Sequence, residues 1–229
     1  MTITIDEISL DSEVNDTLSM YGAVYFQPHE KAIYVSKPNQ AYYFQTYVGY
    51  HEINVAFGDS VYYISASKEE VYLKKGPAVI HSQYCATVIR GFMGSPVTAS
   101  LSEGTVLPYV NGCSTRQLIY PQRIGDPTLQ FLKIPAYSKE QAHHIHWTVR
   151  VVYILKGLGE SIVGMEGKSV SVTLKEGMVC ILEPMCPHHF ETPHGKSIEV
   201  VPLHVFSSAG AAETNHPMFN GTYLMNQGA

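Results

Sequence analysis

Three histidines in the second half of the chain have the residue type and spacing of a metal site. His144 and His146 lie two residues apart at the start of an apolar run, so on a β-strand both side chains point to the same face. His188 follows where a later apolar run meets a proline-bounded turn. Three imidazoles leave coordination positions open for water or substrate. The spacing therefore indicates a site for a divalent transition metal; the alternative is that these are ordinary buried histidines.

The composition is that of a globular protein without a polyanionic partner. The 229 residues are 45% hydrophobic and 15% charged, with a formal net charge of −5. No Lys/Arg run is dense enough for nucleic acid or a membrane surface. The acidic N-terminus lacks a secretory pattern, no apolar run is long enough to span a bilayer, and the four cysteines form no CxxC pair. We therefore expect a cytoplasmic protein with free thiols, without nucleic-acid or membrane partners.

The pattern along the chain predicts an all-β protein. Short apolar or alternating runs rich in Val, Ile, Tyr and Thr recur between turns made of Gly, Pro and Ser. Many short strands with closely spaced turns indicate a sandwich or barrel, since a βαβ fold would need longer gaps. The best helix candidate is residues 6–22.

The sequence also resembles itself. Sliding the chain by 101 residues aligns residues 33–86 with 134–187, with identities at turn glycines and buried aliphatic positions. The alternative is that two unrelated β-stretches share turn glycines and alternating valines. A duplication predicts one small barrel in residues 1–108 and a second in residues 109–229.

The second half resembles the cupin superfamily. The first motif of that family, G(X)5HxH(X)3–4E(X)6G, is matched by His144, His146 and Gly157. The second motif, G(X)5PxG(X)2H(X)3N, is matched by Gly177 and His188. The resemblance implies two jelly-roll barrels of the RmlC-like type, with the metal in the second barrel. The remaining motif positions differ: Ser138, Glu183 and Met185 replace the family's Gly, Pro and Gly.

The largest departure from the motif is Arg150, which occupies the position of the acidic metal ligand. A three-histidine sphere remains, as some cupins use, and Glu183 or Glu191 could add a carboxylate from another position. In the first half, the repeat places Tyr43, Gln45 and Thr87 where the second half has its histidines. We expect the first barrel to hold no metal and to serve packing or oligomerisation, as in a homodimer.

Two further residues are candidates for catalysis. An inward Arg150 would place a guanidinium near a metal ion, which is unfavourable unless a bound anion bridges them. An outward Arg150, paired with a surface acid, is the alternative. His204 lies in the apolar segment VVPLHVF and could line the cavity as an acid or base; the alternative is a core or surface histidine.

The resemblance and the residues together favour a metal-dependent enzyme that acts on a small anionic organic molecule. The leading expectation is a dioxygenase with Fe(II) on three histidines. The alternatives are a non-redox isomerase, cyclase or lyase that uses Zn, Ni or Mn, with Cu also a possible ion, and a regulatory protein of two cupin barrels that binds a small molecule without catalysis.

Overall fold

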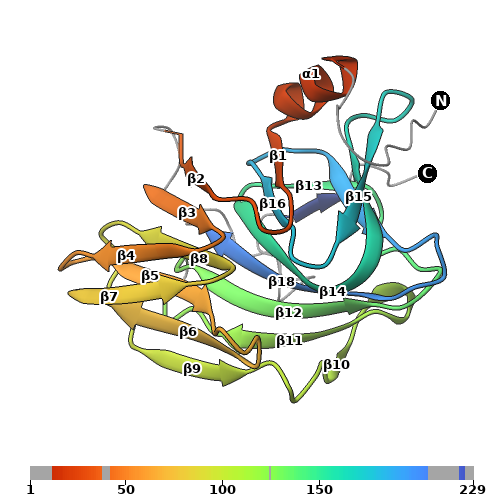
Figure 1. Cartoon of the computed structure of the whole chain (residues 1–229). Helices are drawn as coiled ribbons and strands as arrows, with labels where there is room; N and C mark the ends of the chain where they lie inside the picture. Colours follow the sequence, from red (N-terminus) through yellow and green to blue (C-terminus); the bar gives the residue numbers. More distant parts are fainter. Residues whose placement is uncertain (1–11, 38–41, 124, 206–221, 225–229) are drawn as a thin grey trace.

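The computed structural model describes residues 12–37, 42–123, 125–205 and 222–224, and they form an almost entirely β structure (Figure 1). One α-helix, α1 (Ser12–Tyr21), lies within the predicted helix 6–22, of which residues 6–11 lie outside the described ranges. This helix is too short to cross a membrane, and no other helix among the described residues could do so. The prediction of an all-β class is confirmed.

The first half of the chain forms a six-stranded sheet and a separate hairpin. The sheet order is β2-β3-β8-β5-β6-β9, and β4 pairs with β7. The strand β1 lies outside this half and pairs with β16 of the second half. The bounds are β1 (Ala23–Phe26), β2 (Ala32–Val35), β3 (Phe44–Val48), β4 (His51–Val55), β5 (Ser60–Ile64), β6 (Glu70–Lys75), β7 (Ala78–Ser82), β8 (Cys85–Ile89) and β9 (Val97–Ser100).

The second half is organised around one long strand, β14. Its first part pairs with β16 and β18, and its last part pairs with β15 and β17. The bounds are β10 (Leu107–Pro108), the 3-10 turn η1 (Val110–Gly112), β11 (Ser114–Ile119), β12 (Thr128–Ile134), β13 (His144–His146), β14 (Val149–Val163), β15 (Val170–Lys175), β16 (Val179–Leu182), β17 (His188–Glu191), β18 (Ile198–Val205) and β19 (Thr222–Leu224).

The strand pairing of the first half recurs in the second. The pairs β3·β8, β8·β5, β5·β6 and β4·β7 have counterparts in β13·β17, β17·β14, β14·β15 and β14·β16. The same four contacts in the same chain order are what two copies of one jelly roll would give. The division at residues 108/109 stays a prediction.

The predicted fixed offset of 101 residues is only partly correct. It holds for β5·β8, where the pair Ser60↔Ile89 becomes Ser161↔Phe190. It is wrong for the other three pairs. For β4·β7, the pair Ile53↔Ile80 should become Ile154↔Ile181, yet Ile181 faces Val151. For this pair the physical reason is that β4 and β5 are separated by a turn, whereas β14 is continuous and contains an irregularity between Ile154 and Lys156. The repeated pairing, rather than the register, therefore supports two copies.

Successive side chains of β14 pack alternately against the first half of the chain and into the second barrel. Val151 and Tyr153 belong to a core shared with first-half residues such as Phe44 and Ile89. Val152 and Ile154 belong to the core inside the second barrel. Because successive side chains in a strand point to opposite faces, Arg150 shares the inner face with Val152 and Ile154. The fold thus directs this arginine into the second barrel.

A glycine allows β14 to pass from one side of the barrel to the other. Gly157 has a φ of +95°, and an added Cβ would lie 2.0 Å from the carbonyl oxygen of Ser197. Gly157→Ala should therefore lower the free energy of unfolding by more than about 3 kcal/mol, since clash adds to a left-handed strain of about 1–3 kcal/mol. Gly167→Ala, which meets open space at φ +77°, is the matched control and should cost about 1–2 kcal/mol. Urea unfolding of both variants measures the difference, and equal losses would contradict the clash.

Candidate metal centre

The three predicted histidines meet inside the second barrel. His144 on β13 is the direct cross-strand partner of His188 on β17, and His146 lies two residues along β13 on the same face. All three side chains are buried. One potential ligand atom from each lies within 4.8 Å of the others, and among the described residues no other group of three such side chains does so. The geometry therefore brings the predicted ligands together.

Hydrogen bonds aim two of these rings at a common point. Nδ1 of His144 lies 2.7 Å from the carbonyl oxygen of Ala142, and Nδ1 of His188 lies 2.8 Å from that of Cys186. Because a carbonyl oxygen can only accept, each Nδ1 carries the hydrogen and each neutral ring presents a lone pair at Nε2. This backbone anchoring fixes the tautomer that binds metal.

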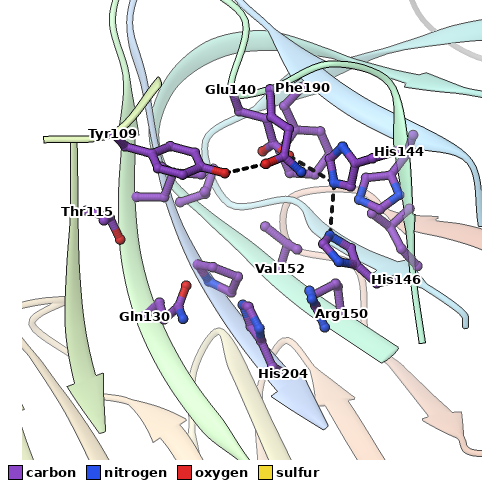
Figure 2. A pocket seen from close by; sticks show the side chains of 16 residues that line it. Tyr109, Thr115, Gln130, Glu140, His144, His146, Arg150, Val152, Phe190 and His204 are labelled. Atoms are coloured by element: carbon purple, nitrogen blue, oxygen red, sulfur yellow. Dashed lines mark hydrogen bonds and ion pairs between the residues drawn. The ribbon is translucent and has the colours of Figure 1, made fainter. Parts of the chain in front are cut away.

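The closest contact in the cluster fits a bound cation. Nε2 of His144 lies 2.9 Å from Nε2 of His146 (Figure 2). At metal–nitrogen distances of about 2.0–2.1 Å, two nitrogens at that separation subtend about 90°, as neighbouring ligands of one ion do. The donor set of three imidazoles is one that transition metals accept. The residues present therefore fit a divalent transition metal.

The histidines are held in the neutral form that metal binding requires. Burial lowers the pKa of His144 to about 3, and the positive charge of Arg150 acts in the same direction. Burial also holds the pKa of His146 and of His188 well below the ordinary value of an imidazole. Protons therefore compete weakly for these nitrogens near neutral pH.

A small cavity lies beside the cluster. Measured as the space open to the centre of a water molecule, its volume is about 40 Å³. Alternation along three strands directs polar side chains into it: Gln130 from β12, Arg150 from β14 and His204 from β18 (Figure 2). Tyr109 also lines it and donates a hydrogen bond of 2.5 Å to Oε1 of Gln141. The enclosed space suits a molecule of few atoms.

Arg150 faces the cavity, so the inward alternative is the one observed. Its side chain is buried, with 4% of its surface exposed, and β14 pairs Arg150 with His204 of β18. Burial lowers its pKa to about 9, partly opposed by the neighbouring Glu140, so it remains a cation at neutral pH. Its Nη1 atom has no hydrogen-bond partner among the described residues. A buried guanidinium with an unused donor can bind an anion.

The carboxyl group nearest the histidines is Glu140, which the sequence analysis missed. Its Oε1 lies 3.6 Å from Nε2 of His144, and it lines the cavity. Burial raises its pKa to about 7 although the charge of Arg150 lowers it. The two acids that the sequence offered as metal ligands lie elsewhere. Glu183 accepts a hydrogen bond from Lys37, and Glu191 contacts His189. Neither lines the cavity.

Glu140 gives a measurable proton signature. In the metal-free protein at pH 7 its carboxyl is about half protonated, and a divalent ion held by the three histidines would lower its pKa. Metal binding at pH 7 should therefore release roughly half a proton per chain, rising below pH 7 and vanishing well above it. Calorimetry in buffers of different ionisation enthalpy measures this release. The isosteric variant Glu140→Gln should bind metal without releasing this proton. An unchanged proton release in that variant would show that the proton comes from another group.

Comparison with known proteins identifies the fold. No protein-family model matches the sequence, and no curated protein does. Among solved structures, oxalate decarboxylase of Lactobacillus farciminis in its formate complex matches with a TM-score of 0.50 at 7% identity, over 88% of this chain and 88% of its own. A point mutant of Bacillus subtilis oxalate decarboxylase matches with 0.50 at 8% identity, over 88% and 79%.

A cupin 2 conserved barrel domain protein of Leptotrichia buccalis matches with a TM-score of 0.45 at 15% identity, over 79% of this chain and 91% of its own. The two oxalate decarboxylases match almost the whole of this chain, both halves included. The low identities restrict the conclusion to architecture. This chain shares its β-barrel fold with these oxalate decarboxylase structures.

Proposed function

We propose that this chain is a metal-dependent enzyme that acts on a small anionic organic molecule in the cavity of the second barrel. The observation that carries the proposal is the juxtaposition of two groups in one enclosed space. Three neutral imidazoles converge on one point, and the buried guanidinium of Arg150 keeps an unused donor beside them. A protein that only packed this core would gain nothing from burying a cation there.

The size and polarity of the cavity define the substrate class. The space open to the centre of a water molecule, about 40 Å³, admits only a few heavy atoms unless the lining moves. Arg150 would hold the anionic group by charge-assisted hydrogen bonds, and a neighbouring oxygen, nitrogen or sulfur would reach the metal. Two structural neighbours are named for oxalate, itself a small carboxylate, which agrees with this class.

The first candidate reaction is oxygenation of the substrate with Fe(II). Three imidazole ligands leave adjacent positions for substrate and dioxygen, and such an ion would supply the redox chemistry. The residues of this chain would bind and orient the substrate: Arg150 would hold its anionic group, and the apolar wall formed by Val152, Leu182 and Phe190 would exclude water.

The second candidate is a non-redox isomerase, cyclase or lyase with Zn, Ni or Mn. It is favoured by Glu140, whose carboxyl lies at the cavity beside His144. A carboxyl at that place can accept a proton from a bound substrate and return it to a neighbouring atom. His204, buried on the opposite side near Arg150, is a second group that could take part.

One experiment separates the candidates. Protein purified without a tag is analysed for metal, stripped, and reloaded anaerobically with Fe(II) or with Zn, Ni or Mn. Each form is then given a panel of small carboxylates. Oxygen consumption only with Fe(II) would support the dioxygenase, whereas anaerobic turnover with deuterium uptake from D₂O would support proton transfer. Binding of a carboxylate without turnover in any form would contradict an enzyme and favour a regulatory binding protein.

A further inference from the structure

A second pair of histidines lies back to back with the metal centre. The chain contains two His-His dipeptides, His143-His144 and His188-His189, and the ladder pairs His144 with His188. In an antiparallel pair the next residues, His143 and His189, also face each other, and alternation turns them to the opposite face. The fold therefore builds one histidine pair inside the barrel and one outside it.

Hydrogen bonds fix which nitrogens of the outer pair are available. Nε2 of His143 donates to the carbonyl oxygen of Gly164 at 2.6 Å, because that oxygen can only accept. Nε2 of His189 lies 3.3 Å from a carboxylate oxygen of Glu191, to which it donates. In both neutral rings Nδ1 then carries a lone pair. These two Nδ1 atoms lie 2.8 Å apart.

Two lone pairs at 2.8 Å repel each other unless a positive species lies between or beside them. The separation again corresponds to about 90° at a metal–nitrogen distance of about 2.0–2.1 Å, which suits neighbouring ligands of one ion. The pair opens into a groove with about 240 Å³ of space for the centre of a water molecule. The groove is also lined by Glu166, whose negative charge acts on His143 although its carboxylate does not join the two histidines in a three-residue ligand group.

We propose that His143 and His189 form a second, solvent-accessible metal site on the outer face of β13 and β17, in which the two Nδ1 atoms are the protein ligands and water completes the coordination. Imidazole is a ligand for Zn²⁺, Cu²⁺ or Ni²⁺ rather than for Mg²⁺ or Ca²⁺. His143 is only half-buried, so an ion can reach the pair from solvent. The site is independent of the reaction proposed for the inner cavity, although β17 carries a ligand to each site.

Zinc alone is the probe for this site. Metal-free protein is titrated with Zn²⁺ against a chromophoric chelator. Wild type should bind two ions per chain, and His143→Ala should bind one, with its remaining affinity within about threefold of the tighter wild-type site. His188→Ala should keep only the outer ion. Glu166→Gln should weaken the outer site, because it removes a negative charge from the groove that holds the ion.

Controls keep the result interpretable. His81→Ala removes an exposed histidine of the first half and should leave two ions bound. Circular dichroism establishes that each variant is folded. The proposal is overturned if wild type binds a single ion, or if His143→Ala still binds two. It is also overturned if ¹⁵N spectra of the two imidazoles show a shared proton that Zn²⁺ does not displace.

Discussion

His188→Ala should lower the affinity of the inner site for its metal by more than about 100-fold while leaving the protein folded. The substitution removes one of three nitrogens, and even loss of a group that only supports a ligand costs about 10–100-fold. The fold should survive because the side chain faces the cavity, whereas the core around it is made of aliphatic residues such as Val152 and Ile198. Competition with a chelator measures the affinity.

Stability gives this first prediction a second readout. In the metal-free protein the rings of His144 and His188 are buried together with the lone pairs of both Nε2 atoms turned into the cluster, which is unfavourable. Removing His188 relieves part of that repulsion but leaves a small cavity. The free energy of unfolding of the metal-free variant should therefore lie within about 1–2 kcal/mol of that of metal-free wild type, and added metal should stabilise wild type more than the variant, which lacks the inner ion. Equal stabilisation of both proteins by one ion at the inner site would rule out His188 as a ligand.

The histidine ligands could be predicted because their signal is local. Two histidines separated by one residue share a strand face whatever the fold, and His188 stands where the cupin motif has its third histidine. The inward direction of Arg150 was left open because it depends on which face of β14 is inner. Only the packing of Val151 against the first half, and of Val152 inside the second, decides that.

Glu140 could not be predicted for a different reason. It lies in an irregular segment between β12 and β13, so no periodicity indicates where its side chain points. Only the turn of that segment toward β17, seen in the backbone bond from Glu140 N–H to Phe190 O, brings its carboxyl near His144. The position of His204 likewise depends on a strand pairing, with Arg150, between residues far apart in sequence.

An ungapped comparison of the two halves predicts their shared strand order but not their strand register. Matching turn glycines, such as Gly58 and Gly159, correctly predict that the two halves share an order of strands. They do not predict which residues face each other, because a strand can shift by several residues along its partner when the connecting turn is lost, as in β14. Topology is set by where turns occur, whereas register is set by packing and by irregularities within strands.

Arg150 should lower the affinity of the inner site for its metal and raise the affinity of that site for an anion. The buried guanidinium repels a cation in the inner site, and its unused Nη1 donor can hold an anion beside that cation. Arg150→Met, which keeps much of the length but loses the charge, should therefore bind the inner metal more tightly when no anion is present. The metal-loaded variant should bind acetate or oxalate about 10–100-fold more weakly, the effect of losing charge-assisted hydrogen bonds worth about 1.5–3 kcal/mol.

Arg150→Lys and Arg150→Glu separate charge from shape. Lysine keeps the charge but loses the planar fork, so metal affinity should stay near that of wild type while anion affinity falls by about 10-fold. Glutamate restores the acid that the cupin motif has at this position, so it should bind the metal most tightly of the series and abolish anion binding and turnover. Calorimetry with the metal alone, then with each anion, measures both affinities. A series in which the two affinities rise and fall together would show that Arg150 supports the fold of the site rather than binding the substrate, because loss of structure weakens both ligands whereas loss of one charge cannot.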